Sequence, residues 1–106
     1  MNLDNGIAEL CLDYPPVNAF NGQGWIDLSK EINNLSSNDE VRVVIIRSNG
    51  KGFCAGVDIK ELAEDSNKIV EVNRGCYESF KAVRACNVPV ISAVHGFCLG
   101  GGVGLV

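Results

Sequence analysis

Two glycine-rich segments of the chain carry the residues that are best suited to chemistry. Residues 96–104 read Gly-Phe-Cys-Leu-Gly-Gly-Gly-Val-Gly and follow a short apolar run, and residues 52–58 read Gly-Phe-Cys-Ala-Gly-Val-Asp. Glycines let a ligand come close to the backbone, and the first N–H groups of a helix have no carbonyl partner within it. The turn before a helix is therefore predicted to point an N–H of Gly100, Gly101 or Gly102 at a bound oxygen. The alternative is that these glycines serve only close packing.

The second segment also ends in a helix start. Asp58-x-x-Glu61 has the form of a capping box, which predicts a helix from residue 58 or 59 with the Glu61 side chain reaching back to the Asp58 backbone N–H. The N–H of Val57 stands just ahead of this helix, and Gly56 beside it leaves the approach open. A catalytic role for the Asp58 carboxylate is the alternative, and the cap explains this residue without one.

Strands and helices alternate along the part of the chain that would position these segments. Alternating apolar residues predict a half-buried strand over 7–14, and apolar runs predict buried strands over 41–46 and 89–94, with 41–46 covered on both faces. Residues at helical spacing predict two amphipathic helices, one capped by Asn21 and one over 67–86. Their apolar stripes are Trp25, Leu28, Ile32 and Leu35, and Ile69, Val72, Cys76, Phe80 and Val83.

This order of elements indicates an α/β fold. Strands 41–46 and 89–94 are predicted to be parallel neighbours joined by a helix, so both glycine-rich helix starts emerge at the same end of the sheet. Two backbone N–H groups that converge on one carbonyl oxygen form an oxyanion hole, which can contribute ~3 to 4 kcal/mol per donor. The arrangement predicts stabilisation of an enolate or of a tetrahedral oxyanion.

Composition excludes several classes of partner. The 106 residues are 46% hydrophobic with a formal net charge of -4, which is typical of a globular chain. Lys and Arg form no run, and no apolar stretch approaches the ~18 residues of a bilayer span. We therefore expect neither nucleic acid nor a membrane as a partner.

The cysteines and the two ends of the chain add further expectations. Five cysteines without a C-x-x-C pair, and His95 as the single histidine, predict neither a disulfide framework nor a metal site, with Cys76 and Cys86 as small core residues and His95 in a structural role. The N-terminus lacks the pattern of a secretion signal, so a cytoplasmic location is expected. The uncapped apolar end at 103–106 predicts a piece of a longer protein.

The paired segments resemble those of the crotonase superfamily, the enoyl-CoA hydratase/isomerase group. The resemblance also includes strand 7–14 and the loop Pro16-Val-Asn-Ala, and so covers essentially the whole chain. It implies a spiral of ββα units, of which residues 1–106 would be the N-terminal part of a single acyl-CoA-binding domain. It also implies a homotrimer, or a hexamer of two trimers, for the full-length protein.

Specific residue roles follow from this resemblance. The family's oxyanion donors fall on the backbone N–H groups of Val57 and Gly101, and the ligand would be the thioester carbonyl of an acyl-CoA. Coenzyme A would belong to the substrate, and no separate cofactor is implied. The implied contacts with substrate and CoA, mostly through backbone, are Val17, Ala19, Cys54, Ala55, Gly56, Val57, Asp58, Ile59, Lys60, Gly100 and Gly101.

One position departs from the family pattern. Hydratases of the family carry a catalytic glutamate two residues after the last glycine of the triplet, where this chain has Gly104. The departure favours an isomerase or a hydrolase that cleaves a C–C bond of a β-dicarbonyl acyl-CoA over a simple hydratase, a lyase. The motifs Tyr14-Pro-Pro-Val-Asn-Ala and Asn73-Arg-Gly-Cys are most similar to those of bacterial members that open the last steroid rings.

Two other interpretations remain open. The run Gly96-Phe-Cys-Leu-Gly-Gly fits a nucleophile elbow with Cys98 at its centre, and so resembles that of dienelactone hydrolases. Gly104 also fits a non-catalytic protein that binds CoA thioesters, or a truncated piece. Because no catalytic carboxylate follows the glycines, we expect the 106 residues to be inactive by themselves.

Overall fold

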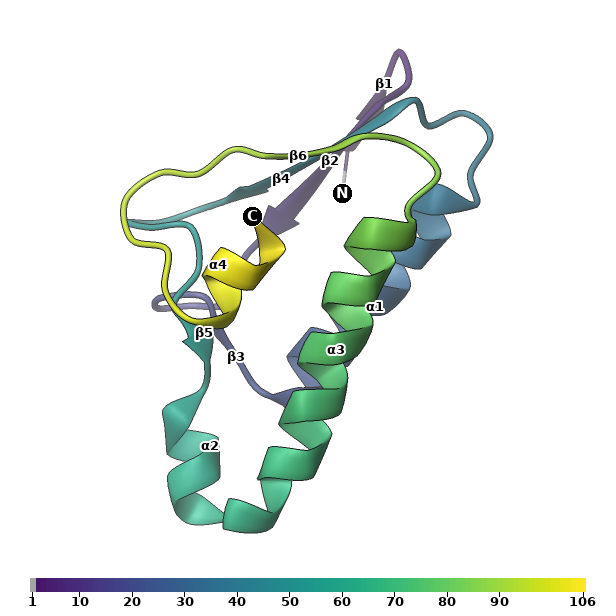
Figure 1. Cartoon of the computed structure of the whole chain (residues 1–106). Coiled ribbons are helices and arrows are strands. Elements are labelled where there is room, and N and C mark those ends of the chain that lie inside the picture. Colours follow the sequence, from purple (N-terminus) through teal and green to yellow (C-terminus); the bar gives the residue numbers. More distant parts are fainter. Residues whose placement is uncertain (1) are drawn as a thin grey trace.

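A computed structural model of the chain describes residues 2–106 and contains one four-stranded sheet (Figure 1). Its strand order is β1-β2-β4-β6. β1 is antiparallel to β2, and the other pairs are parallel. The strands are β1 (Asn2–Asp4), β2 (Ile7–Leu12), β4 (Val43–Ser48) and β6 (Val90–Ser92). The predicted α/β architecture and the parallel pairing of the two apolar runs are confirmed.

The sheet differs from the sequence prediction in three places. β1 and its hairpin were not predicted, although Asn5 and Gly6 both have positive φ, 52° and 85°, as a tight two-residue hairpin turn requires. The first strand ends at Leu12 instead of residue 14, because the Tyr14 N–H bonds the Asn18 side chain at 2.7 Å and starts a turn. β6 forms the edge of the sheet with Ile91 53% exposed, so the prediction of a buried strand was wrong.

The central strand β4 is also less covered than predicted. Val44 and Ile46 are fully buried, whereas the side chains between them are half-buried. Among residues 2–106 the helices pack against one face of the sheet, so the expectation of cover on both faces was wrong. The core lies on that face, between the buried side chains of β2 and β4 and those of helix α1 (Gly22–Ser36).

Helices α1 and α3 (Ile69–Ala85) lie side by side (Figure 1), and both were predicted. Asn21 caps α1 as expected, accepting from the Gly24 N–H at 2.7 Å. The helices touch through small residues, because a Cβ on Gly75 would stand 2.6 Å from the Trp25 Cβ. The α3 stripe is rotated accordingly: Ile69 is 43% exposed, contrary to prediction, and the buried residues are Val72, Gly75, Ser79 and Ala82.

Four short elements build the region around the glycine-rich segments. They are β3 (Ala19–Phe20), β5 (Gly56–Val57), α2 (Ile59–Glu64) and α4 (Gly101–Leu105), with a 3-10 turn, η1 (Ser66–Lys68), before α3. Figure 1 shows α4 between β5 and α3, and it contacts both. Over residues 2–106, every helix is too short or too polar to cross a bilayer.

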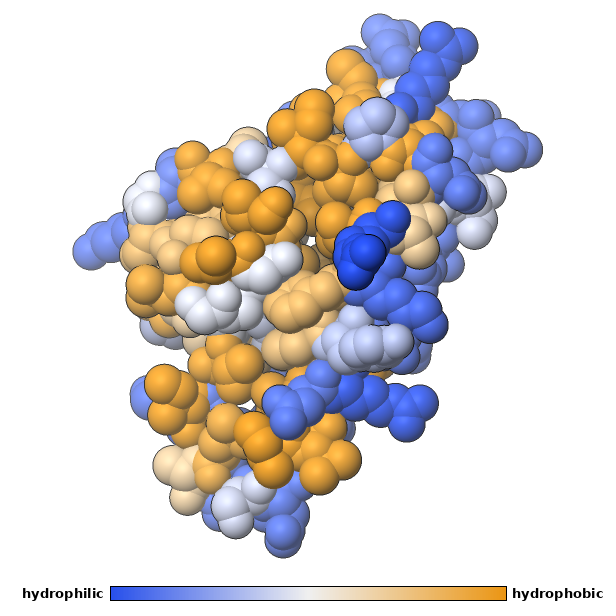
Figure 2. Space-filling view, viewed as in Figure 1, coloured by the Kyte–Doolittle hydropathy of each residue, from blue (hydrophilic) through white to orange (hydrophobic). Residues whose placement is uncertain are grey.

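One face of the molecule is markedly apolar. Figure 2 shows hydrophobic residues gathered over β6, α4 and the loop between them. The exposed side chains of this face include Ile91, Val94, Leu99, Val103 and Val106. The glycine-rich end of the chain is therefore partly exposed on this face.

Candidate active site

The first half of the site is built by pairing two segments that are far apart in sequence. β3 and β5 are parallel, with Ala19 opposite Gly56 and Phe20 opposite Val57. The Ala55 N–H donates to the Val17 carbonyl at 3.1 Å, and the Asp58 N–H donates to the Phe20 carbonyl at 2.9 Å. The structure therefore brings together the 16–20 and 54–60 segments that the resemblance assigned to one ligand.

Asn18 holds the turn that delivers β3 to β5. Its side-chain oxygen accepts from the Tyr14 N–H at 2.7 Å, and its Nδ2 donates to the Phe53 carbonyl at 3.0 Å. The residue is 3% exposed and has a positive φ of 55°, a conformation that asparagine tolerates better than most residues. Sequence reasoning missed this role, although an asparagine within a proline-rich turn was the available signal.

Asn18→Ala is expected to lower the free energy of unfolding by about 2 to 3 kcal/mol, because it leaves buried backbone groups unpaired and places a Cβ residue in the left-handed region. Asn18→Gly removes the same hydrogen bonds without the backbone strain and should cost less. Urea unfolding of both variants measures the difference. Equal losses would show that the conformation of residue 18 contributes nothing.

The second glycine-rich segment runs alongside the first. The Phe53 N–H donates to the Phe97 carbonyl at 2.9 Å, and the Leu99 N–H donates to the Cys54 carbonyl at 3.0 Å. Cys54 and Cys98 form an isolated parallel bridge between these bonds. The convergence of the two segments, which the sequence predicted from strand order, is confirmed.

The two predicted oxyanion donors lie close together at this junction. A Cβ on Gly56 would stand 3.0 Å from the Gly101 nitrogen and 2.9 Å from the Leu99 carbonyl oxygen, and Gly56 has a φ of 97°. Adding the bonds that separate this Cβ position from the Val57 nitrogen puts the nitrogens of Val57 and Gly101 no more than about 7 Å apart. Only glycine at residue 56 permits this approach.

The direction of the Val57 N–H, and the lack of an acceptor for the Gly101 N–H, follow from the local structure. Successive amides of a strand point to opposite sides, and the Asp58 N–H points at β3, so the Val57 N–H points away from β3. Gly101 is the first residue of α4, and its N–H has no acceptor among residues 2–106. Both N–H groups are left without a partner from the neighbouring strand or helix.

Asp58 caps α2 as predicted, but the capping box is incomplete. The Asp58 carboxylate accepts from the Lys60 N–H at 3.0 Å. The Glu61 carboxylate does not reach back to the Asp58 N–H, because the Phe20 carbonyl already occupies that donor. Glu61 accepts from the Gly22 N–H at 3.2 Å instead and so ties α2 to the start of α1.

A groove of about 440 Å³ lies beside the junction. Seven of the residues predicted to contact CoA line it, namely Val17, Ala19, Ala55, Val57, Asp58, Ile59 and Lys60, together with Tyr14, Pro15, Pro16 and Leu99. Gly56, Gly100 and Gly101 form the adjoining backbone and do not line the groove. Cys54 is fully buried behind it, so a direct CoA contact by its side chain is not available.

Burial raises the pKa of the Cys54 thiol to about 11, and a hydrogen bond from the Gly56 N–H opposes that shift only in part. Burial also raises the pKa of Cys76. The Cys54 Sγ donates to the Asn18 carbonyl at 3.1 Å. At neutral pH this thiol is a packed, protonated group and not a nucleophile.

The folded state is expected to lose stability as the pH rises from about 9.0 to about 11, because the unfolded chain ionises Cys54 first and the folded chain resists it. Below pH 9 both states hold the proton, and this thiol adds no pH dependence. Unfolding of the wild type and of Cys54→Ala, followed across this range, measures the effect. A Cys54→Ala curve as steep as the wild-type curve would contradict the assignment.

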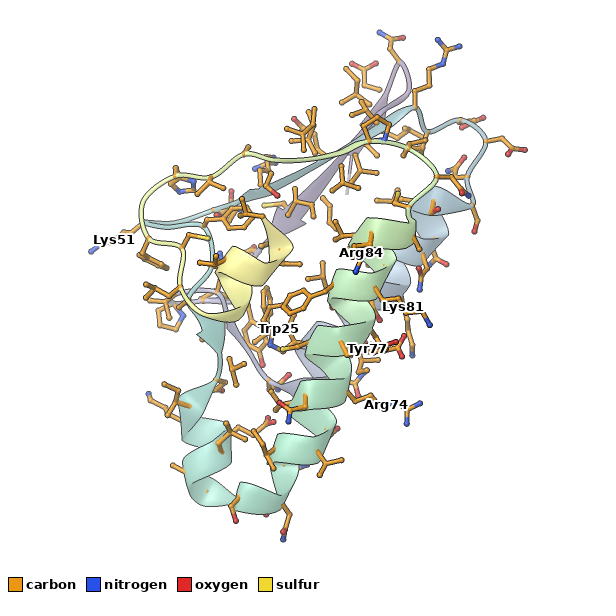
Figure 3. The ribbon with its side chains drawn as sticks, viewed as in Figure 1. Trp25, Lys51, Arg74, Tyr77, Lys81 and Arg84 are labelled. Carbon is orange, nitrogen blue, oxygen red and sulfur yellow. The ribbon has the colours of Figure 1, made fainter. Side chains whose placement is uncertain are left out.

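Aromatic side chains form the floor beneath α4. Figure 3 shows Trp25 between α3 and α4, and a Cβ on Gly101 would stand 2.8 Å from its Cζ2 atom. Trp25 packs edge-to-face against Phe20 and Phe80, with ring centroids 5.2 and 5.9 Å apart. Its Nε1 has no acceptor among residues 2–106, so packing alone holds the indole, which confirms its predicted place in the core.

Gly104 also contacts an aromatic ring. A Cβ at this position would stand 2.5 Å from the Phe80 Cζ atom, so the ring occupies the space that a side chain at residue 104 would need. Sequence reasoning identified the missing glutamate but not its physical counterpart, Phe80. Phe80 and Gly104 are 24 positions apart and belong to different helices, so their contact leaves no local pattern in the sequence.

The remaining candidate groups have structural explanations. His95 Nε2 lies 2.9 Å from the Gly50 carbonyl oxygen and is exposed, in keeping with the predicted structural role. Cys76 and Cys86 are partly buried against the core, as expected. Across residues 2–106, no group of His, Cys, Asp or Glu side chains could hold a metal ion.

Residues 2–106 match the family described as enoyl-CoA hydratase/isomerase, so the chain belongs to that family, the crotonase family. One relative is the (7aS)-7a-methyl-1,5-dioxo-2,3,5,6,7,7a-hexahydro-1H-indene-carboxyl-CoA hydrolase of Mycobacterium tuberculosis. It is 50% identical to the chain over 103 residues, and the alignment covers 95% of the chain and 42% of that protein. The hydrolase of the same name from Rhodococcus jostii is 48% identical over 104 residues, covering 96% of the chain and 40% of that protein.

A solved structure supports the fold. The enoyl-CoA hydratase/carnithine racemase from Magnetospirillum magneticum superposes with a TM-score of 0.87 at 31% identity, covering 97% of the chain and 40% of that protein. The predicted fold class, the N-terminal portion of the crotonase fold, is confirmed. The chain spans about two fifths of the length of these relatives.

Proposed function

We propose that this chain binds an acyl-CoA thioester as substrate, as part of a crotonase-type enzyme. The backbone N–H groups of Val57 and Gly101 hold the thioester carbonyl oxygen. The close approach of Gly56 to the Gly101 nitrogen is the observation that carries the proposal. The groove lined by Val57, Asp58 and Lys60 supports it, because it places open space beside the proposed donors. Preorganised donors aimed at this oxygen stabilise the charge that develops on it.

Hydrolysis of a C–C bond is the reaction that we favour for the complete enzyme. Gly104 supplies no carboxylate for adding water to a double bond, and two relatives with about half of their aligned residues identical are named as hydrolases of a cyclic dioxo acyl-CoA. In a β-dicarbonyl thioester, water adds to the ring ketone, the bond between that carbon and the α-carbon breaks, and its electron pair moves into the thioester enolate. The two N–H groups would stabilise this enolate until a proton is returned to the α-carbon.

The substrate proposed is therefore a cyclic β-diketone CoA thioester of the kind formed when the last steroid rings are degraded. An isomerase is the second candidate, because relatives named as dienoyl-CoA isomerases also match this chain, at 30% identity for the protein from Arabidopsis thaliana. Both reactions use the same carbonyl donors. They differ in whether water is consumed.

Titration calorimetry tests the binding step. We expect the 106-residue chain to bind crotonyl-CoA more tightly than free coenzyme A, since only the thioester offers the carbonyl oxygen. We also expect these 106 residues to show no turnover, because Gly104 supplies no carboxylate. Equal affinity for the two ligands, or binding of neither, would overturn the proposal.

A control separates the proposal from a cysteine hydrolase. Cys98→Ala should leave thioester binding unchanged if the backbone N–H groups hold the carbonyl. Fast hydration of crotonyl-CoA by the longer enzyme, with slow cleavage of a cyclic β-diketone thioester, would contradict the assigned reaction. Loss of all turnover when Cys98→Ala is made in the longer enzyme would support the nucleophile elbow instead.

A further inference from the structure

One side chain contacts the elements that carry both proposed donors. Trp25, the single tryptophan of the chain, is fully buried in α1. Its ring packs edge-to-face on Phe20 at 5.2 Å between centroids, and Phe20 is paired in register with Val57. A Cβ on Gly101 would stand 2.8 Å from the Cζ2 atom and 3.0 Å from the Cη2 atom of the same indole. Trp25 therefore contacts the strand pair of one donor and the residue of the other.

The helix that carries the Gly101 donor has few local features to fix its position. Three of the five residues of α4 are glycines, Gly101, Gly102 and Gly104, and glycine is a poor helix former. The N-cap residue, Gly100, has a φ of 49° and makes no side-chain cap bond. The position of the Gly101 N–H therefore depends on what α4 packs against, and the nearest side chain is that of Trp25.

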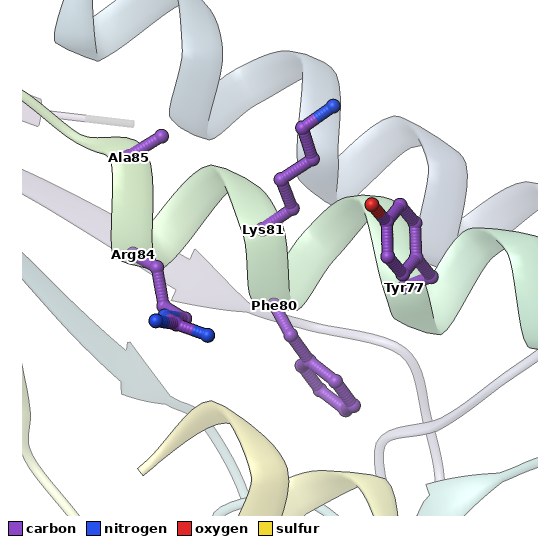
Figure 4. A pocket seen from close by; sticks show the side chains of 5 residues that line it. All are labelled: Tyr77, Phe80, Lys81, Arg84 and Ala85. Carbon is purple, nitrogen blue, oxygen red and sulfur yellow. The ribbon is translucent and has the colours of Figure 1, made fainter.

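Trp25 is itself held in place from α3. The Ser79 hydroxyl donates to the Trp25 carbonyl at 2.6 Å, and a Cβ on Gly75 would stand 2.6 Å from the Trp25 Cβ. Phe80 points from α3 toward α4 (Figure 4) and packs edge-to-face on the indole at 5.9 Å between centroids. A side chain locked in this way can serve as a fixed support for its neighbours.

We infer that Trp25 is a positioning residue of the oxyanion hole, whose indole fixes where the Gly101 N–H lies relative to the Val57 N–H. The inference rests on the proposed acyl-CoA function and adds a residue that does not line the groove. A smaller ring would leave space beneath Gly101 into which the start of α4 can settle. A displacement of about 1 Å is enough to weaken the hydrogen bond to an oxygen shared with Val57.

Titration calorimetry with crotonyl-CoA and free coenzyme A tests the inference. Trp25→Phe should reduce the preference for crotonyl-CoA about threefold to tenfold, the loss of one hydrogen bond, with the Kd of coenzyme A unchanged. In NMR spectra of the same variant, crotonyl-CoA should still shift the Val57 amide proton and should shift that of Gly101 less. A purely structural role of the indole would change stability and leave this preference in place.

Ile32→Val is the matched control. Ile32 is fully buried on the same helix, and the atoms nearest to a Cβ on Gly101 belong to Trp25 and Gly56 instead. This variant also opens space in the core, but it should keep the wild-type preference for crotonyl-CoA. An equal loss of preference in Ile32→Val and Trp25→Phe would show a general loosening of the core and would overturn the inference.

Replacing Trp25 with β-(3-benzothienyl)alanine separates the shape of the indole from its N–H group. This side chain keeps the two fused rings and has sulfur in place of the N–H. It should restore the preference that Trp25→Phe loses, because Nε1 has no acceptor among residues 2–106. A folded benzothienyl variant without the preference would show that the N–H acts as a donor, and support by packing would be wrong.

Circular dichroism reports whether each variant is folded, and the wild type supplies a test that needs no variant. Nuclear Overhauser contacts should join the indole protons of Trp25 to Gly101, and their absence would overturn the inference. A wild-type preference in folded Trp25→Phe would also overturn it. If the wild type itself binds crotonyl-CoA no better than coenzyme A, the proposed function fails, and the inference fails with it.

Discussion

Gly96→Ala is expected to lower the free energy of unfolding by about 4 kcal/mol, a larger loss than we expect for the other substitutions. A Cβ at residue 96 would stand 2.1 Å from the Lys51 carbonyl oxygen and 2.9 Å from the Gly52 Cα, both of them backbone atoms that cannot rotate away. Gly96 also has a φ of 62°, which a residue with a Cβ adopts only at a cost. The variant should separate the two glycine-rich segments.

Gly50→Ala provides the comparison for this prediction. Gly50 has a φ of 95° in the facing loop, but a Cβ there would meet nothing within 4 Å. This variant should therefore lose only about 1 to 2 kcal/mol, the cost of a left-handed backbone. Urea unfolding of the two variants separates crowding from backbone strain, and equal losses would show that the 51–54 and 96–99 segments do not pack as described.

Gly104→Glu is expected to destabilise the chain by about 2 kcal/mol and to produce no hydratase. The new side chain would have to displace the Phe80 ring, which stands 2.5 Å from the Cβ position and is held against Trp25. A glutamate restored at residue 104 alone would therefore clash with the Phe80 ring, which fills the space of its side chain. Thermal unfolding and a crotonyl-CoA hydration assay measure the two parts of this result.

The same substitution should be tolerated once Phe80 is removed. In a Phe80→Ala background the clash is gone and glutamate has a better helix propensity than glycine, so Gly104→Glu should be neutral or slightly stabilising. The coupling between the two positions in a double-mutant cycle should then be about 2 kcal/mol. Additive effects would show that Phe80 does not occupy the space beside residue 104.

Periodic and capping signals predicted the elements that local sequence determines. Asn21 and Asp58 cap helices where expected, and the apolar repeat predicted α1 and α3 to within a few residues. Parallel pairing of β4 with β6 followed from the strand-helix-strand order. Through that pairing, the convergence of the glycine-rich segments was also predictable.

The features that were missed depend on contacts between distant residues. The buried line of α3 is set by the close approach of α1, which favours Gly75 and Ser79 over the more hydrophobic Ile69. Glu61 bonds Gly22 because the backbone pairing of β3 with β5 occupies the Asp58 N–H. The contact of Phe80 with Gly104 likewise depends on where α4 lies, and no spacing within α3 encodes that position.

The amide resonances of Val57 and Gly101 offer the most direct measurement, because a 106-residue chain is small enough for residue-resolved NMR. During titration with a non-hydrolysable acyl-CoA thioether that keeps the carbonyl, both amide protons should shift downfield together and saturate at one ligand concentration. Free coenzyme A should leave both in place. If only one of the two amides responds to the carbonyl, or if neither does, these residues do not share one oxygen and the proposed oxyanion hole does not exist.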